Sequence, residues 1–134
     1  MIRPALLALA TLAAAPAIAQ PAVNWNRGTP VAITVDNDRF TPSRINLRAG
    51  RPYTITIRNR SDRKHNFAAK TFFGLARVAP QDSGWVTDNK VDLAPGQTAR
   101  LRIIAPDTPN AVYEYRSTNL LDAAEKLKGK IYVR

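Results

Sequence analysis

Apolar residues alternate with polar or small residues in short runs along most of this chain of 134 residues. Successive side chains of a β-strand point to opposite faces, so a period of two is typical of strands with one buried face. The apolar members of these runs fall at 33–35, 45–47, 53–57, 91–93, 99–103, 113–115 and 131–133. Seven short strands in a chain of this length predict an all-β sandwich.

The segments between these runs contain turn and helix signals. Ala49-Gly50 precedes one predicted strand, and Pro95-Gly96 precedes another with the residue order of a type II turn. The alternation breaks at residues 72–78, which are compact and apolar, and at residues 120–127, whose leucines would share one helix face. We predict one or two turns of helix in each of these two segments.

The amino-terminal residues have the pattern of a secretory signal. Arg3 precedes an apolar run that ends at Ala15, and residues 17–19 follow with a small-x-small cleavage pattern. We therefore predict a signal peptide over 1–19, a flexible leader over 20–29 and one domain over 30–134. Such a signal would place the mature protein in the periplasm. No later stretch is apolar enough to span a bilayer.

The charge and cysteine content narrow the possible functions. The chain has no cysteine, so its stability depends on the apolar core, and disulfide or thiol chemistry is excluded. It has 20 basic and 10 acidic residues, and loss of Arg3 with the signal would leave 19 against 10, or +9. In an exported protein this charge favours anionic lipid headgroups, polyanionic envelope polymers or an acidic partner over nucleic acid. A basic surface without a dedicated partner is the alternative.

Two parts of the chain resemble the two halves of a cupredoxin. The amino-terminal resemblance rests on Phe40-Thr-Pro42, Ile45-Asn-Leu47, Ala49-Gly50 and His65-Asn-Phe67. The carboxy-terminal resemblance rests on a glycine-turn hairpin at 91–98 and on the strands 113–115 and 129–133, which in that family bracket the metal loop. The resemblance implies a cupredoxin-like Greek-key β-sandwich of about seven to eight strands with one or two short helices.

The resemblance also indicates which residues stand at the copper-ligand positions. His65 matches the first histidine ligand, Ser117 stands at the cysteine position and Leu127 at the methionine position. The second histidine would fall within 119–122, where no histidine occurs. Type 1 copper needs a thiolate and two imidazoles, usually with a weak thioether. The chain has no cysteine and one histidine, so no fold can assemble a blue-copper centre from it.

Among cupredoxin-like proteins, the chain is most similar to the EfeO-type domains of envelope iron-uptake systems. The similarity includes the ending Lys128-Gly-Lys-Ile-Tyr-Val133, and the classical copper ligands are often missing from those domains. It implies an accessory role in the handling of iron or copper in the envelope. Because function resides in sites and not in folds, this role rests on analogy.

Three interpretations of His65 remain open. It can be a structural histidine that hydrogen-bonds the neighbouring loop. It can join Asp122, Asn119 and Glu125 in a weak site for a divalent metal, with donors that suit iron, zinc or manganese better than copper. It can also serve as a base for Ser117, although no glycine-framed nucleophile surrounds that serine. We expect no resident cofactor and no enzymatic activity.

Basic residues flank both His65 and the loop before the last strand. A cupredoxin fold would bring them to one end of the sandwich, as a basic patch of Arg60, Arg63, Lys64, Arg116, Lys126 and Lys128. Such a patch could steer an acidic envelope protein or a metal-uptake component toward the chain. Two functions therefore remain: an accessory protein in envelope metal handling, and a metal-free protein-interaction module.

Overall fold

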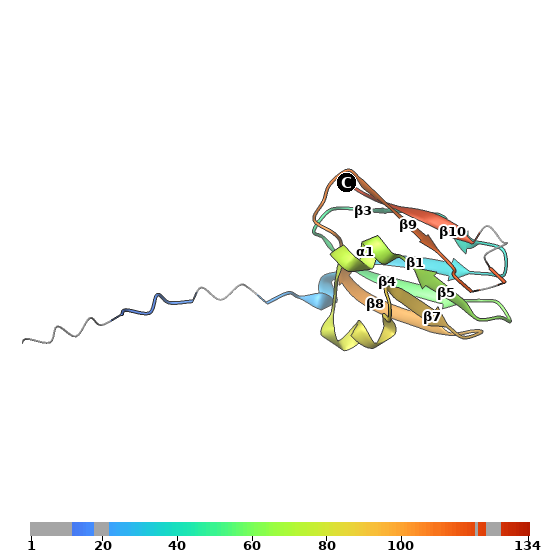
Figure 1. Ribbon diagram of the computed structural model, residues 1–134, viewed down its shortest axis with the longest axis horizontal. Helices are drawn as coiled ribbons and strands as arrows, with labels where there is room; N and C mark the ends of the chain where they lie inside the picture. Colours follow the sequence, from blue (N-terminus) through green and yellow to red (C-terminus); the bar gives the residue numbers. More distant parts are fainter. Residues whose placement is uncertain (1–11, 18–21, 120, 123–126) are drawn as a thin grey trace, which may run out of the picture.

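The computed structural model describes residues 12–17, 22–119, 121–122 and 127–134, and it forms a sandwich of two five-stranded sheets (Figure 1). The first sheet has the order β2-β1-β4-β8-β6, and the second has the order β3-β10-β9-β5-β7. The first sheet contains β1 (Thr29–Val35), β2 (Phe40–Thr41), β4 (Pro52–Asn59), β6 (Arg77–Val78) and β8 (Thr98–Ile104). The second contains β3 (Arg44–Leu47), β5 (His65–Ala68), β7 (Lys90–Leu93), β9 (Ala111–Arg116) and β10 (Lys128–Val133).

All seven alternating runs lie in strands, so the predicted β-sandwich is confirmed. In β4, for example, Tyr53, Ile55 and Ile57 are buried between the sheets while the residues between them are partly exposed. The structure adds β2, β5 and β6, which brings the described strands to ten. The two sheets close over one apolar core, in which aromatic rings from β2, β5, β9 and α1 pack edge to face or stacked.

The predicted turn at Pro95-Gly96 is present between β7 and β8. The Gln97 amide donates to the carbonyl of Ala94 at 3.0 Å, which closes a four-residue turn. Gly96 has a φ of +74°, the value that a type II turn requires at its third residue. A residue with a side chain is strained in this conformation, and the glycine therefore fixes the hairpin.

The helix predicted over 72–78 is partly correct. An α-helix, α1, spans Lys70–Leu75, but Arg77 and Val78 form β6 and pair with β8. Phe72 and Phe73 are buried, so packing against the core decides where this helix lies. Two short 3-10 helices, η1 (Trp25–Arg27) and η2 (Pro80–Trp85), complete the structure.

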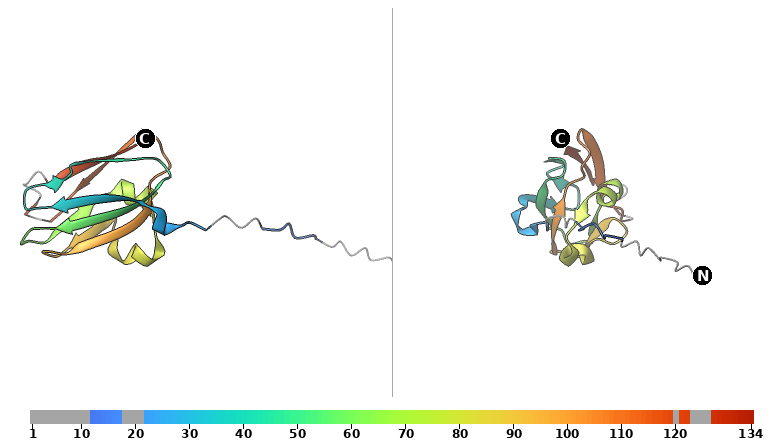
Figure 2. Two further views of the ribbon diagram at one scale, coloured as in Figure 1. Left: turned by 180° about the vertical axis from the view of Figure 1, so that it is seen from behind. Right: turned by 90° about the vertical axis from the view of Figure 1, so that its left-hand side faces the viewer.

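Two other predicted segments fall partly outside the described residues. Of the helix predicted over 120–127, Leu121 and Asp122 form a turn, and Leu127 is extended chain just before β10. Of the leader predicted over 20–29, η1 lies against β4 and β8, and β1 already begins at Thr29. The described residues before η1 run away from the sandwich (Figure 2). None of the described helices is long and apolar enough to cross a membrane.

An ion pair fastens η2 to β8. The Arg102 guanidinium donates to both carboxylate oxygens of Asp82, at 2.7 and 2.9 Å, and the Arg102 amide donates at 2.9 Å. The side-chain bond from Arg102 lowers the pKa of Asp82. A carboxylate whose pKa is lower in the folded state stabilises the fold above its ordinary value of about 4. This contribution is lost as the pH falls through the lowered pKa.

The direction of the strands divides the molecule into two ends. β1 and β4 run parallel, and their last residues, Val35 and Asn59, are paired. His65 begins β5, Arg116 ends β9 and Lys128 begins β10 at this same end, which we call the histidine end. The beginnings of β1 and β4 lie at the opposite end, together with the last residues of β3 and β10, and we call this the arginine end.

Candidate functional site

The residues at the copper-ligand positions of the resemblance come together at the histidine end. His65 is the first residue of β5, Ser117 directly follows β9, and Leu127 directly precedes β10. All three are at most 4 % exposed, and the Ser117 amide donates to the Leu127 carbonyl at 3.0 Å. The predicted arrangement of these positions around one loop is therefore present.

One carboxylate oxygen joins the polar members of this group. Asp122 Oδ2 lies 2.6 Å from His65 Nδ1 and accepts the Ser117 hydroxyl at 2.5 Å. The side chains of His65 and Asp122 are 0 % and 2 % exposed. A protein carboxylate therefore links the first-histidine position to the cysteine position. We call His65, Ser117 and Asp122 the polar cluster.

The hydrogen bonds around His65 determine where its protons lie. His65 Nε2 is 3.1 Å from Asn37 Oδ1, which also accepts from Arg63 Nε, while Asn37 Nδ2 donates to Asp62. These two bonds fix the Asn37 amide, so Nε2 faces an acceptor and must carry a proton. Nδ1 lies against the Asp122 carboxylate, which is a second acceptor. The geometry of the two contacts therefore fits an imidazolium paired with a carboxylate.

Asn66 fastens the loop after β9 to the beginning of β5. Its amide N–H donates to Ser117 Oγ at 3.1 Å, so the Ser117 proton is directed to Asp122. The Asn66 side chain exchanges two hydrogen bonds with Thr118, each of 2.9 Å. Asn119 Nδ2 donates to the Lys64 carbonyl at 2.8 Å. Among the described residues, no buried side-chain nitrogen or oxygen lacks a hydrogen-bond partner.

The residues proposed for a divalent metal site are only partly brought together. His65 and Asp122 are in contact, Asn119 binds the Lys64 carbonyl, and Glu125 lies outside the described residues. Both ring nitrogens of His65 are already engaged by protein groups, Nδ1 by Asp122 and Nε2 by Asn37. Among the residues with described positions, no three His, Cys, Asp or Glu side chains form a group that could hold a metal.

The polar cluster does not fit type 1 copper. No thiolate or second imidazole is available in the chain, and the cysteine and methionine positions hold a hydroxyl and an alkyl side chain. The cluster does not form a serine–histidine pair either, because Asp122 lies between the two side chains and Ser117 donates to it. A hydroxyl needs an adjacent base to act as a nucleophile, and here its neighbour is a carboxylate already paired with the imidazolium.

The described members of the predicted basic patch lie at the histidine end, but carboxylates accompany part of them. Arg60, Lys64, Arg116 and Lys128 are exposed, Arg63 is partly exposed, and Lys126 lies outside the described residues. Asp62 and Asp38 are exposed in neighbouring loops of the same end. Hydrogen bonds from Asn37 and Arg39 lower the pKa of these two carboxyl groups, so both are charged at neutral pH.

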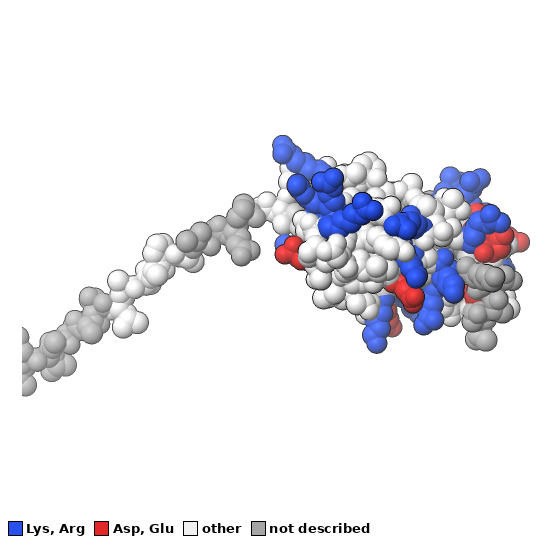
Figure 3. Space-filling view, turned by 90° about the horizontal axis from the view of Figure 1, so that it is seen from above, with Lys and Arg blue, Asp and Glu red and all other residues white. Residues whose placement is uncertain are grey.

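The excess of basic groups is clearer on the side of β3 and β10. Figure 3 shows Lys and Arg side chains along the length of this side, with fewer acidic ones between them. A depression of about 440 Å³ lies here, and Arg116, Lys128 and Lys130 line it, with Glu114 as the one carboxylate among the described lining residues. Arg116 and Lys128 of the predicted patch therefore belong to a larger basic surface.

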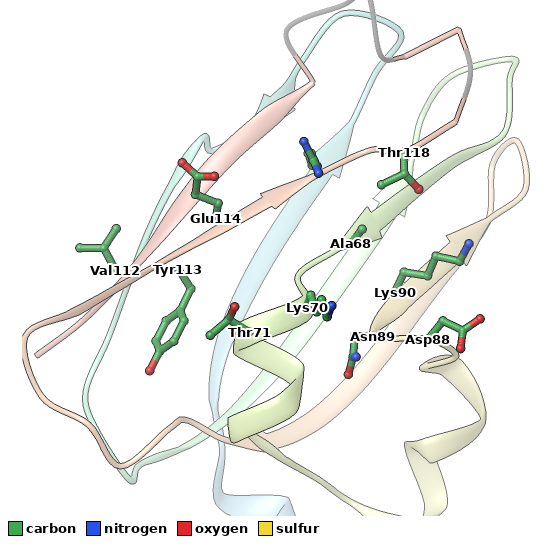
Figure 4. A pocket seen from close by; sticks show the side chains of 11 residues that line it. Ala68, Lys70, Thr71, Asp88, Asn89, Lys90, Val112, Tyr113, Glu114 and Thr118 are labelled. Atoms are coloured by element: carbon green, nitrogen blue, oxygen red, sulfur yellow. The ribbon is translucent and has the colours of Figure 1, made fainter.

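A further depression, of about 650 Å³, separates β9 from α1 (Figure 4). It exists because β5 pairs with β9 through one residue pair only, Ala68 and Arg116, and α1 follows where the pairing stops. Val112 and Glu114 of β9 line one side, and Lys90 lies on the other (Figure 4). Basic and acidic side chains are mixed here, so the lining does not select one class of ligand.

Two asparagines that support the polar cluster were missed by the sequence analysis. Asn37 fixes the protons of His65 from the loop between β1 and β2. Asn59 is fully buried at the end of β4, and its Nδ2 donates to the carbonyls of Arg63, Leu93 and Ala94. Asparagine is common in loops, so nothing in a single sequence marks these two residues as structural.

Comparisons with known proteins agree with the fold. The chain resembles reduced auracyanin from Roseiflexus castenholzii, with 18% identity over 80% of this chain and 98% of that protein, at a TM-score of 0.59. It also resembles the McoA multicopper oxidase of Aquifex aeolicus, with 13% identity over 85% of this chain and 31% of that protein, at a TM-score of 0.64. A search of curated proteins finds no significant match.

A family model matches a larger part of this chain than the solved structures do. The model of the cupredoxin-like domain matches residues 5–131, which is most of the chain. The order of the strands and the loop between β9 and β10 are in keeping with this match. The chain belongs to the cupredoxin-like domain family.

Proposed function

We propose that this chain is a periplasmic accessory protein that docks a partner in envelope metal handling and does not hold blue copper. The observation that carries the proposal is the position of Asp122. Its carboxylate accepts from His65 and Ser117, and so protein groups satisfy one another where a cupredoxin would present ligands to copper. Electron transfer through copper would require the donors that this chain lacks.

The basic side of the sandwich supports docking to an acidic partner. Arg116, Lys128 and Lys130 border one depression, and none of them forms an ion pair within the described part of the chain. Unpaired positive charges increase the rate at which an acidic surface associates and select against basic partners. An acidic envelope protein or a component of a metal-uptake system has the matching chemistry.

The proposal predicts a docking interaction that depends on charge. The chain is immobilised, and an envelope extract from its own source is passed over it as the ionic strength rises from about 0.05 to 0.5 M. We expect an acidic protein to be retained at low salt and released at high salt. The variant Arg116→Glu/Lys128→Glu should retain about tenfold less of the same protein, because four units of charge change at the docking surface.

The matched control is Arg58→Glu/Arg100→Glu. It makes the same change of charge at exposed positions of β4 and β8, on the other sheet. The control should retain the partner nearly as well as the unchanged chain does. Equal losses in the two variants, or retention that is indifferent to salt, would show that the basic side is not a docking surface.

A further inference from the structure

A second basic site lies at the arginine end, opposite the polar cluster. An open depression of about 660 Å³ is lined there by the beginnings of β1 and β4, by the last residues of β3 and by Arg134, which follows β10. Four of the lining residues are arginines, all exposed: Arg27, Arg48, Arg51 and Arg134. Among the residues with described positions, no acidic one lines the depression, so positive charge dominates it.

Backbone hydrogen bonds hold three of these arginines together. The Arg51 amide donates to the Arg48 carbonyl at 3.3 Å, so a tight turn places both residues at the same end. The Ala49 amide donates to the Arg134 carbonyl at 2.7 Å, and the Arg134 amide donates to Leu47 at 2.9 Å. The guanidinium groups are therefore carried by an ordered backbone.

The four guanidinium groups are not neutralised by the chain itself. Within the described residues, the ion pairs involve other arginines, and none includes any of the four. Asp107 is nearby, since its Oδ1 would lie 3.1 Å from a Cβ at Gly50, but it does not line the depression. Several cations around one depression without counter-ions give it a positive electrostatic potential. A bound anion would reduce that potential.

A buried hydroxyl adds a directed donor to this site. Tyr53 lines the depression and is 8 % exposed, and its Oη accepts the Arg48 amide at 2.7 Å. A tyrosine hydroxyl can also donate one proton, and the hydrogen bond to the Arg48 amide, in which Oη accepts, leaves that proton available. The hydroxyl can therefore donate to a group bound between the arginines.

We propose that this depression binds a phosphate group, either of a small phosphorylated anion or of an anionic lipid headgroup. Guanidinium groups are planar and donate two parallel bonds, which match the oxygens of a phosphate. The arginines would supply these bonds, and Tyr53 would supply a neutral donor from the wall of the site. This binding is independent of the polar cluster and of the docking surface on the side of β3 and β10.

Inorganic pyrophosphate, titrated into the full chain at low ionic strength and followed by calorimetry, tests the site. We expect binding that weakens about tenfold or more in Arg48→Gln/Arg51→Gln, because two charge-assisted donors to the anion are lost. Tyr53→Phe should weaken binding about fivefold through the loss of one donor. The control Arg58→Gln/Arg100→Gln has the same net charge as the first variant and should bind within about twofold of the unchanged chain.

A second arm identifies the source of the phosphate. The chain is mixed with vesicles of phosphatidylcholine, with and without phosphatidylglycerol. Association with the phosphatidylglycerol vesicles alone, lost in Arg48→Gln/Arg51→Gln but not in the control, supports a lipid headgroup. Binding of pyrophosphate without any vesicle association supports a soluble anion. No binding of either probe, or equal weakening in the double variant and its control, would overturn the proposal.

Discussion

Asp122→Ala is expected to lower the free energy of unfolding by about 3–5 kcal/mol, because it breaks a buried pair and removes the acceptor shared by two buried side chains. The His65 side chain is 0 % exposed, and its Nδ1 proton has no acceptor once the carboxylate is gone. Ser117 loses the acceptor of its hydroxyl in the same variant. Chemical denaturation at neutral pH, followed by tryptophan fluorescence, measures the loss.

Two further variants distinguish the effect of breaking the His65–Asp122 pair on stability from the effect of losing side-chain volume. Glu114→Ala removes an exposed carboxylate from β9 and should change stability by at most about 0.5 kcal/mol. Replacing both members, in His65→Leu/Asp122→Leu, should destabilise less than the sum of the single changes, because no unpaired charge remains. If Asp122→Ala were as stable as Glu114→Ala, the His65–Asp122 pair would not stabilise the fold.

Gly129→Ala should be the second most damaging change, with a loss of about 3 kcal/mol. Gly129 pairs with Tyr115 across β9 and β10, and a Cβ at this position would lie 2.2 Å from the Tyr115 ring and 2.6 Å from the Ser43 carbonyl oxygen. Tyr115 cannot move away easily. Its ring stacks on Phe67 at 4.6 Å and its hydroxyl donates to the Pro42 carbonyl at 2.8 Å.

The burial of Tyr115 has a signature of its own. Burial raises the pKa of its hydroxyl to about 12. An ultraviolet titration of Gly129→Ala should therefore show one tyrosine that ionises closer to the ordinary value of about 10, because the ring is displaced. Gly74→Ala is the matched control, since a Cβ there meets no atom within 4 Å. If the two variants melted at the same temperature, Tyr115 and Gly129 would not be in close contact.

The sheets were predictable because burial repeats with the period of a strand. Ile33 and Val35, for example, alternate with partly exposed residues in the sequence and are buried in β1. The short strands β2 and β6 were not predicted, since two residues cannot show a period. The end of α1 was misplaced for a related reason. An apolar residue such as Val78 fits a helix or a strand equally well, and only its pairing with Ile103 of β8 shows that it belongs to a strand.

The polar cluster was predictable only in part. The family pattern placed His65 next to the loop that contains Ser117. In the structure, the residue after His65 donates its amide to Ser117 Oγ. The sequence does not show that one oxygen of Asp122 accepts from both His65 and Ser117. This contact joins residues 57 positions apart, His65 and Asp122, and it depends on the path of the loop after β9. The arginine end was not predicted at all, because Arg27, Arg48 and Arg134 come together only when β3 pairs with β10 and η1 packs against β4 of the other sheet.

The most direct measurement is a two-bond ¹H–¹⁵N correlation spectrum of His65, which is the only histidine of the chain. At neutral pH we expect both ring nitrogens to give the shifts of protonated nitrogen, and one equivalent of Zn²⁺ or of copper should leave them unchanged. A ring nitrogen that lacks a proton and shifts when metal is added would show that the polar cluster is a metal site, and would contradict the pairing of an imidazolium with Asp122.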